Sequence, residues 1–371
     1  MKILVVGRKF GGVAGGVERM AIVLLNALYE RGHEAQLLTW DVDGAEAYYP
    51  MDPGIRWHRL NMGDASVKAS WKLRLARQVR MRALIKRQRP DVIVAFQLGP
   101  FVAIRLAVLG LGIPVVAAER NAPQRFDHTR VGRHRVLWFQ TFRMASTITV
   151  QLESYRNEYP PYLRERIEVI PNPVQGADGS AAPEGLVGQQ KALLCVARLT
   201  YQKNQGVLIG AFAKIADSFP DWRLRLVGDG DLREQFVRLA RDRGIAERVD
   251  FAGDIKDVSA EYASAHLFCM PSLWEGFPNA VAEAMAHGLP VVGFADCAGI
   301  NELIRPGENG LLAAGVFDAD ELAETLGLLM ADAPLRREMG EKAKRISHAY
   351  RAEHIFPMWE SLFERLARGR V

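Results

Sequence analysis

Short apolar runs recur along the chain, and segments with the spacing of amphipathic helices separate them. Residues 2–7 predict a buried strand, the loop of residues 8–16 follows it, and Gly32 ends a helical segment before a second strand at residues 36–40. This order predicts a βαβ unit, the usual beginning of a parallel sheet. The apolar stripe of the helical segment consists of Met20, Val23, Leu24, Ala27 and Leu28.

The alternation of strands and helices continues to the end of the chain, with one interruption. Residues 175–190 are rich in Gly, Ala and Pro and hold few bulky apolar residues, so they predict a linker. We therefore expect α/β domains at residues 1–174 and 191–353, followed by a helical segment at 354–371. The remaining expected strands lie at residues 90–96, 113–118, 147–150, 167–170, 192–197, 223–227, 249–253, 265–270 and 290–294, and residues 309–312 predict a turn and a short strand.

Length and composition fit a globular protein of two domains. The chain has 371 residues, of which 49% are hydrophobic and 25% are charged. No apolar run reaches the ~18 residues needed to span a bilayer. The apolar run at residues 2–7 is a short strand and lacks the usual length of the apolar region in a signal peptide, so we expect a cytoplasmic protein. The three cysteines form no C-x-x-C pair and predict buried free thiols: Cys195, Cys269 and Cys297.

Positive charge is concentrated in the first half of the chain. Residues 1–188 hold 26 Lys and Arg against 17 Asp and Glu, a net of +9, whereas residues 189–371 hold 22 against 26, a net of −4. After a polar stretch at residues 41–65, which predicts a surface loop, residues 66–89 contain nine basic residues and no acidic one. This imbalance suggests that the first half faces an anionic surface.

The basic segment also has an apolar face. Val67, Trp71, Leu75 and Val79 repeat every four residues, which is the spacing of one face of a helix. A basic amphipathic helix with a tryptophan is typical of a membrane-surface element or a binder of polyanions. A packed surface helix with solvated charges is the alternative, and nucleic acid is disfavoured because no stacking aromatic residues are interleaved. The basic residues expected to contact an acceptor or a membrane are Lys68, Lys72, Arg74 and Arg77.

Two carboxylates in the second half, Glu275 and Glu283, stand eight positions apart. A buried strand precedes them, a Gly-Phe-Pro-Asn turn follows the first, and the second lies about two turns into a helix that ends at Gly288. Backbone N–H groups at such a helix start can hold an anion such as a diphosphate. The carboxylates beside it suit hydroxyl groups of a sugar and of a ribose. A solvated helix start is the alternative, because Glu is common in first turns.

This block of Glu, seven residues and Glu resembles the signature of the retaining glycosyltransferase family 4 (group 1), which has the GT-B fold. The resemblance covers nearly the whole chain, because further motifs follow the family's order at Gly15-Gly16, at Arg198 with Lys203, and at Glu302. It implies two Rossmann-like domains that face each other across a cleft, with a C-terminal helix that crosses back to the first domain. It also implies that the first domain binds the acceptor and the second binds the nucleotide sugar.

The resemblance assigns roles to the matching residues. Gly15 and Gly16 would let the backbone approach the donor phosphates and the acceptor. Lys203, with Arg198, would clamp the diphosphate, while Glu275 would position the donor sugar. The remaining expected donor-binding positions are Glu283 at the ribose, backbone near Ile255 at the base, and Gly276, Phe277, Pro278 and Asn279 at the helix start.

The sequence departs from the family pattern near the expected reaction centre. Many members have a His just past the strand at residues 113–118, whereas Glu119 stands here and His128 lies further along. Charged residues just past a buried parallel strand lie at the sheet edge where α/β proteins bind ligands. Glu119 is therefore a candidate catalytic residue that orients the acceptor hydroxyl, and pairing with Arg120 is the alternative.

Two further motifs do not predict other chemistry. Asp229-Gly230-Asp231 resembles the Asp-x-Asp that holds a divalent ion in another glycosyltransferase class, but a Gly-Asp-Gly turn before a helix also accounts for it. The loop at residues 8–16 matches Gly-x-Gly-x-x-Gly only loosely, although Asp41 follows the second strand. We therefore expect no metal and no other cofactor.

The resemblance implies a glycosyltransferase of the hexosyltransferase type that uses a nucleotide diphosphate sugar, with UDP as the expected nucleotide. The expected acceptor is a hydroxyl of a glycan or of a polyprenyl-diphosphate-linked molecule, in the assembly of surface polysaccharide or lipid-linked oligosaccharide. Peripheral contact with the inner face of an anionic cell membrane is expected, and nucleic acid is not. Domain closure about the hinge would exclude water from the donor. A GT-B-like sugar-nucleotide epimerase and a non-catalytic nucleotide-binding scaffold stay open as alternatives.

Overall fold

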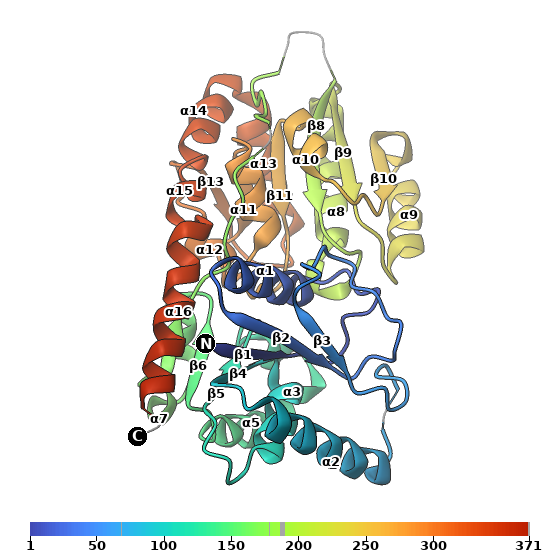
Figure 1. Cartoon of the computed structure of the whole chain (residues 1–371). Coiled ribbons are helices and arrows are strands. Elements are labelled where there is room, and N and C mark those ends of the chain that lie inside the picture. Colours follow the sequence, from blue (N-terminus) through green and yellow to red (C-terminus); the bar gives the residue numbers. More distant parts are fainter. Residues whose placement is uncertain (68, 178, 186–189, 370–371) are drawn as a thin grey trace. The chain divides into compact units, whose positions relative to one another are not determined.

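A computed structural model describes residues 1–67, 69–177, 179–185 and 190–369 of the chain. It contains two compact units, each with its own parallel sheet (Figure 1). Unit 1 comprises Met1–Asn172 and Glu353–Val371, and unit 2 comprises Pro173–Ala352. The prediction of two Rossmann-like α/β domains is confirmed.

Unit 1 is organised around a seven-stranded sheet in the order β3-β2-β1-β4-β5-β6-β7, in which all neighbours are parallel. Helix α1 lies on one face of the sheet, and α2, α3 and α5 lie on the other (Figure 1). Because helices cover both faces, the central strands β1, β4 and β5 are apolar and buried except at Lys2, the first residue of β1. The strands are β1 (Lys2–Val6), β2 (Glu34–Thr39), β3 (Arg56–Arg59), β4 (Val92–Phe96), β5 (Val115–Ala118), β6 (Thr147–Val150) and β7 (Ile167–Val169). The main helices are α1 (Gly16–Glu30), α2 (Trp71–Gln88), α3 (Leu98–Ala107), α4 (Arg125–His128), α5 (Arg135–Phe142), α6 (Glu153–Glu158) and α7 (Pro161–Arg164).

The edge strand β3 corrects the expectation of a loop at residues 41–65. Its four residues are Arg, Trp, His and Arg, so no apolar pattern marks it in the sequence. Trp57 Nε1 donates to Thr39 Oγ1 at 2.9 Å, and His58 Nε2 lies 2.8 Å from Gln36 Oε1. These side-chain bonds to β2 replace the apolar packing by which a strand is usually recognised.

Unit 2 is organised around a six-stranded parallel sheet in the order β10-β9-β8-β11-β12-β13. Helices α8 and α13 pack against each other in this unit. The strands are β8 (Lys191–Val196), β9 (Trp222–Val227), β10 (Val249–Gly253), β11 (Leu267–Met270), β12 (Val291–Phe294) and β13 (Gly310–Ala313). The main helices are α8 (Gln205–Ile215), α9 (Arg233–Asp242), α10 (Ser259–Ser264), α11 (Asn279–Ala286), α12 (Ile300–Leu303), α13 (Ala319–Ala331), α14 (Ala333–Ala343) and α15 (Ile346–Ala349).

The last helix, α16 (Ala352–Arg368), packs on unit 1 through ion pairs and a buried face that includes Phe356, Trp359 and Phe363. Glu360 lies 2.9 Å from His33 Nε2 and 3.4 Å from Arg31 Nε. Trp359 is fully buried, and the Arg120 guanidinium lies 5.1 Å from the centre of its ring. These contacts fix α16 to the end of α1 and to the loop that follows β5.

The described part of the expected linker is held against unit 2. The N–H of Ala181 donates to the carbonyl of His287 at 2.8 Å. Arg336, which is buried, donates from Nε to the carbonyl of Pro183 at 2.7 Å and from its second terminal nitrogen to that of Glu184 at 3.1 Å. The expected linker is therefore not a free tether at these residues. Residues 178 and 186–189 of this segment lie outside the part of the chain that the structure describes.

Candidate functional site

The expected donor residues of unit 2 follow different strands of one parallel sheet. Arg198 and Lys203 come after β8, Ile255 after β10, Glu275 after β11 and Glu302 after β12. The carboxyl ends of parallel strands meet at one edge of the sheet, and α/β proteins bind ligands at this edge. The fold therefore brings these loops to the same side of unit 2.

Glu275 is held by a cation and by a hydroxyl group. Its Oε1 accepts from Lys203 Nζ at 2.5 Å and from Ser272 Oγ at 2.6 Å. The Glu275 side chain is only 7% exposed and that of Lys203 is 17% exposed. A buried carboxylate is costly unless a cation and hydrogen bonds compensate it, and both are present here.

The loop that carries Arg198 is shaped by the glycines of the Gly-Asp-Gly turn. Gly228 has φ +122°, and a Cβ there would lie 2.3 Å from the carbonyl oxygen of Ala197. A Cβ at Gly230 would lie 2.4 Å from the carbonyl oxygen of Leu199. Only glycine lets the two backbone segments come this close. The contacts fix Ala197 and Leu199 on either side of Arg198, whose side chain is exposed.

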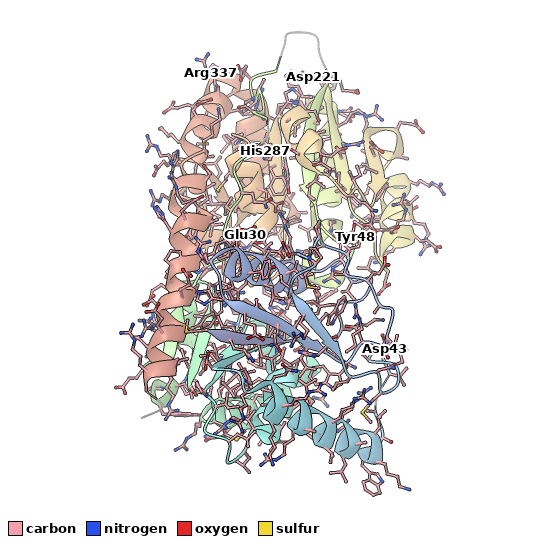
Figure 2. All side chains as sticks on the ribbon, viewed as in Figure 1. Glu30, Asp43, Tyr48, Asp221, His287 and Arg337 are labelled. Atoms are coloured by element: carbon pink, nitrogen blue, oxygen red, sulfur yellow. The ribbon has the colours of Figure 1, made fainter. Side chains whose placement is uncertain are left out.

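Glu283, in the middle of α11, is fixed by two neighbouring side chains. The buried Tyr262 on α10 donates its O–H to Glu283 Oε2 at 3.0 Å. His287, labelled in Figure 2, has Nδ1 2.8 Å from the carbonyl oxygen of Glu283 and Nε2 3.0 Å from Ser259 Oγ. Because a carbonyl only accepts, Nδ1 must carry the proton of that bond. The network ties α10 to α11 at the position of Glu283.

The expected anion cradle lies at the start of α11, which begins at Asn279 with Pro278 as its N-cap. The side chain of Phe277 is buried and packs edge-on against Tyr350, with 5.4 Å between the ring centres. Phe277 could therefore contribute to a ligand only through its backbone. Gly276 and Asn279 are partly exposed.

The glycine-rich loop of unit 1 leads directly into α1. Gly15 is the N-cap with an extended backbone, and Gly16 is the first helical residue. Asp41 accepts from the backbone N–H of Phe10 at 2.8 Å and of Gly11 at 3.1 Å. Asp41 is buried and holds this loop in place. This structural role accounts for the acidic residue after β2, so the residue does not indicate a dinucleotide site.

Glu119 lies where the sequence predicts, at the carboxyl end of β5, and it is buried. Its Oε1 accepts from the backbone N–H groups of Arg120 at 3.1 Å and Asn121 at 3.3 Å. The Arg120 guanidinium donates instead to the carbonyl of Ile170 and to the Thr149 hydroxyl, at 3.0 and 2.7 Å. Burial lowers the pKa of Arg120 to about 9, although the Glu119 carboxylate opposes this shift. Glu119 and Arg120 therefore meet through the backbone N–H of Arg120 and not through its guanidinium. His128 is exposed on α4.

The basic residues expected to meet an acceptor or a membrane have different surroundings. Lys72 and Arg74 on α2 are exposed. Arg77 is buried, and its Nε and one terminal nitrogen donate to the carbonyl of Met62 at 3.1 and 2.7 Å. The expectation for Arg77 is corrected accordingly, because its charge is used to hold a loop of unit 1. Lys68 lies outside the described residues.

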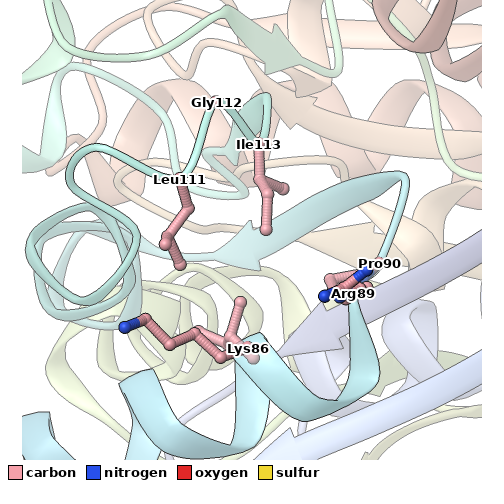
Figure 3. A pocket seen from close by; sticks show the side chains of 7 residues that line it. Lys86, Arg89, Pro90, Leu111, Gly112 and Ile113 are labelled. Carbon is pink, nitrogen blue, oxygen red and sulfur yellow. The ribbon is translucent and has the colours of Figure 1, made fainter.

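A cavity of about 610 Å³ in unit 1 lies away from the expected site. In Figure 3 the side chains of Leu111 and Ile113 point toward α2, where Lys86 and Arg89 lie. Pro90 and Ile113 directly precede β4 and β5, so the cavity lies at the amino ends of these strands. Glu119 lies at the carboxyl ends of the strands, at the opposite edge of the sheet. The cavity is therefore not part of the expected donor or acceptor site.

Within the described ranges, no cluster of three or more His, Cys, Asp and Glu side chains is arranged to hold a metal ion. Asp229 uses its Oδ1 to accept from the N–H of Gly230 at 2.7 Å, inside the turn described above. The three cysteines are buried and free, as predicted, and burial raises the pKa of Cys195 to about 12. No helix among these residues combines the length and the apolar character needed to cross a bilayer.

Two family models match most of the chain, one in each half. The model described as Glycosyltransferase Family 4 matches residues 14–175, and the model described as Glycosyl transferases group 1 matches residues 180–346. The chain belongs to glycosyltransferase family 4 (group 1), and it is a glycosyltransferase.

Relatives of similar sequence and solved structures of the same fold cover nearly the whole chain. An uncharacterized glycosyltransferase of Haemophilus influenzae is 28% identical, covering 95% of this chain and 97% of that protein. A Campylobacter jejuni α-1,4-N-acetyl-D-galactosaminyltransferase that acts on a PP-undecaprenol-linked saccharide is 24% identical, covering 94% of this chain and 95% of that protein. Sucrose-phosphate synthase of Thermosynechococcus elongatus has the same fold with a TM-score of 0.84 and 21% identity over 99% of both chains. HepE of Anabaena in complex with UDP and glucose has a TM-score of 0.76 and 20% sequence identity, covering 98% of this chain and 99% of that one. The GT-B fold is confirmed.

Ser272 and Tyr262 are among the residues of the site that the sequence did not predict. Ser272 stands three positions before Glu275 in the Pro-Ser turn, and this spacing was a usable signal. Tyr262 is 21 positions before Glu283 on a different helix, so no local pattern joins the two. Its role becomes visible only when α10 and α11 are packed.

Proposed function

We propose that this glycosyltransferase moves a sugar from a nucleotide diphosphate sugar to a hydroxyl of a glycan or a lipid-linked acceptor, with retention of anomeric configuration. UDP is the nucleotide that we favour, and the HepE complex supports it. The C. jejuni relative supports an acceptor carried on a polyprenyl diphosphate and a role in glycan or surface-polysaccharide assembly. A lipid-linked acceptor would place the reaction at the cytoplasmic surface of a membrane.

The pair of carboxylates at one edge of unit 2 carries this proposal. Glu275 is paired with a cation, Lys203, whereas Glu283 is held by a neutral phenol, Tyr262. Both bonds fix the orientation of a carboxylate, and carboxylate oxygens accept hydrogen bonds from ligand hydroxyls. Glu275 beside the cation suits the sugar next to the diphosphate, and Glu283 within α11 suits the ribose.

Lys203 is suited to link the sugar and the leaving group. An ammonium has three N–H donors, so Lys203 can keep its bond to Glu275 and still donate to a phosphate oxygen. When the bond between the sugar and the diphosphate breaks, negative charge develops on the leaving phosphate. Lys203 and the exposed Arg198 would stabilise this charge, and backbone N–H groups near residues 276–279 would add to it. We therefore propose that the reaction needs no divalent ion.

The acceptor residue is proposed on unit 1. Glu119 is held by backbone N–H groups and is surrounded by buried residues, so its orientation is fixed. We assign to it the positioning of the acceptor hydroxyl, and to Gly15 and Gly16 a close approach of backbone to ligand.

Nucleotide binding gives the first test of this proposal. Thermal unfolding is recorded for the whole chain with UDP, GDP, ADP, TDP and the corresponding sugar nucleotides. A ligand that binds only the folded state raises the melting temperature, because it stabilises that state by RT ln(1 + L/Kd), where L is the concentration of free ligand. Glu283→Ala is compared with Glu234→Ala, which removes an exposed carboxylate on α9.

The proposal expects a shift with one nucleotide that Glu283→Ala removes and Glu234→Ala preserves. A shift that survives Glu283→Ala would remove the assigned role of that carboxylate. The absence of a shift with every nucleotide would contradict the donor site itself.

A further inference from the structure

Helix α2 exposes an apolar strip to solvent. Trp71 is 71% exposed, Leu75 59% and Val79 65%, and we call these three residues the α2 strip. Its members are four positions apart, so they share one face of the helix. A shallow depression of about 560 Å³ runs along this face, where the strip is joined by Lys72, Ala76, Arg80 and Ala83.

Polar side chains fasten α2 to unit 1: Arg77 on the side opposite the α2 strip, and Gln78 and Arg82 on the flank that meets α3. Arg77 donates to the carbonyl of Met62, Gln78 to that of Ala103 at 3.1 Å, and Arg82 to that of Ala107 at 2.8 Å. Met81 and Ile85 are buried beneath the helix. These bonds fix the rotation of α2 about its axis. The apolar face expected from the sequence is therefore directed outward, and it is not the face that packs on the domain.

Positive charge surrounds the α2 strip. Lys72, Arg74 and Arg80 are exposed, and Lys72 Nζ lies 5.7 Å from the centre of the Trp71 ring. The sequence contains no Asp or Glu between Asp64 and Asp91. A partner for this face must therefore offer negative charge and an apolar interior together.

Two further large apolar residues are exposed at the end of α3 and just after it. Leu106 is 54% exposed and Leu109 64% exposed. Arg82 of α2 donates to the carbonyl of Leu109 at 2.8 Å, so the two helices meet at this point. Large apolar residues exposed together on neighbouring helices mark an interaction surface rather than a chance exposure.

We propose that the α2 strip, together with Leu106 and Leu109, docks unit 1 on an anionic lipid bilayer. The apolar side chains enter the region below the headgroups, while Lys72 and Arg80 extend their stems and reach the lipid phosphates. A tryptophan suits this position because its ring is apolar and its N–H finds a polar partner at the interface. The surface lies in unit 1 and uses none of the proposed donor residues, so it stands independently of the proposed reaction.

Vesicle binding tests the proposal on the whole chain. Sedimentation with vesicles of phosphatidylcholine alone is compared with an equal mixture of phosphatidylcholine and phosphatidylglycerol. The triple variant Trp71→Ser, Leu75→Ser, Val79→Ser should bind the mixed vesicles more than about tenfold more weakly, because it removes buried apolar area. The pair Lys72→Gln and Arg80→Gln should weaken binding by about fivefold for each cation.

Matched variants on unit 2 separate a specific surface from a general loss of charge or apolar area. Leu328→Ser removes a side chain that is 63% exposed on α13. The pair Arg238→Gln and Arg241→Gln removes two exposed cations of α9. Both controls should bind the mixed vesicles as the unchanged chain does. Brominated lipids supply a second readout, since they should quench a fluorescence component that Trp71→Phe removes.

Several results would overturn the proposal. One is unchanged vesicle binding by the triple variant, and another is equal binding to neutral and mixed vesicles. A third is a dimer in light scattering that the triple variant dissociates, because the strip would then be an interface between two copies. Nucleotide-induced thermal shifts on the same variants keep the two proposals apart: a variant that loses lipid and keeps nucleotide leaves the donor site untouched.

Discussion

Lys203 Nζ lies 2.5 Å from Glu275 Oε1, and the pair joins loops 72 positions apart in the sequence. Both side chains are largely buried, and Ser272 donates to the same carboxylate oxygen. Lys203 therefore neutralises the charge of Glu275 at the edge of the unit 2 sheet where the carboxyl ends of the strands lie. The same two residues are those proposed for the donor sugar and the diphosphate, so structure and function depend on one contact.

Removing one partner of this pair should cost stability. Lys203→Met leaves the Glu275 carboxylate buried without its cation, and we expect a loss of about 3 kcal/mol in the free energy of unfolding. Glu275→Gln in the same chain removes the uncompensated charge, so the double variant should recover part of this loss. Urea unfolding of the single and double variants measures the coupling. Additive losses would show that the pair is not energetically linked.

Tyr262 should act through Glu283 on nucleotide binding. Tyr262→Phe removes a hydrogen bond to a charged group, worth about 1.5–3 kcal/mol, and frees the Glu283 side chain to rotate. We expect nucleotide diphosphate to bind about tenfold more weakly, with a smaller preference for ribose over 2′-deoxyribose. Calorimetric titration with both nucleotides measures this preference. Tyr48→Phe, at an exposed residue of unit 1, is the control. An equal loss for both nucleotides would indicate a general packing effect instead.

Gly228 should tolerate no side chain. Gly228→Ala places a Cβ 2.3 Å from the carbonyl oxygen of Ala197 at a φ of +122°, so the Arg198 loop must move. We expect a loss of more than about 2 kcal/mol in stability and weaker nucleotide binding. Gly327→Ala within α13 meets only an ordinary contact at 3.9 Å and should be neutral or stabilising by up to about 1 kcal/mol. Thermal unfolding compares the two, and equal melting temperatures would contradict the close approach.

Arg77 and Arg80 lie on the same helix but should behave differently. Arg77→Met leaves the carbonyl of Met62 without a buried donor, so we expect a loss of about 1–3 kcal/mol in the stability of unit 1. Arg80→Met changes an exposed residue and should alter stability by less than about 0.5 kcal/mol. Chemical unfolding of both variants distinguishes a charge that holds a loop from a charge that faces solvent. Similar losses for both would be inconsistent with the burial of Arg77.

The stability of unit 2 should fall as the pH drops from 6.5 to 4. Burial, assisted by Arg336 and Lys191, lowers the pKa of His266 to about 4, although Glu184 and Asp221 oppose the shift. Its Nδ1 accepts from the N–H of Ala192 at 3.1 Å, which requires the neutral ring. In this pH range the unfolded chain binds a proton that the folded chain does not, so the free energy of unfolding decreases. With the partly exposed ring taken into account, we expect about 1–2 kcal/mol.

His266→Asn keeps an acceptor near Ala192 but does not titrate. Unfolding midpoints in urea, measured across this range, should therefore decline less steeply for the variant than for the unchanged chain. Parallel curves for the two chains would show that His266 does not contribute to the pH dependence.

The sequence predicts the strands and the carboxylates of the site because both have local signals. Buried parallel strands are continuous apolar runs, as in β1 and β4, and Glu275 and Glu283 stand at a fixed spacing around a turn. The edge strand β3 lacks this signal, since side-chain hydrogen bonds hold it to β2. Periodicity alone therefore detects the core of each sheet better than its margin.

Partners that depend on packing are not predictable from spacing. Tyr262 reaches Glu283 from another helix, and nothing in the sequence near either residue indicates the contact. Periodicity also identifies an apolar face on α2 without saying which way it points. The sequence predicts that Arg77 contacts an acceptor or a membrane, whereas its long side chain reaches back to Met62 and is buried.

Transfer of a labelled sugar tests the central claim most directly. The purified chain is incubated with membranes of its source cells and with one radiolabelled nucleotide sugar at a time, and the label in the organic-solvent extract is counted. We predict that one UDP-sugar labels the lipid fraction, and that Glu275→Gln lowers this transfer by at least about 100-fold while Glu234→Gln leaves it unchanged. Absence of label from every nucleotide sugar, or equal transfer by Glu275→Gln, would contradict the assignment of this site to glycosyl transfer.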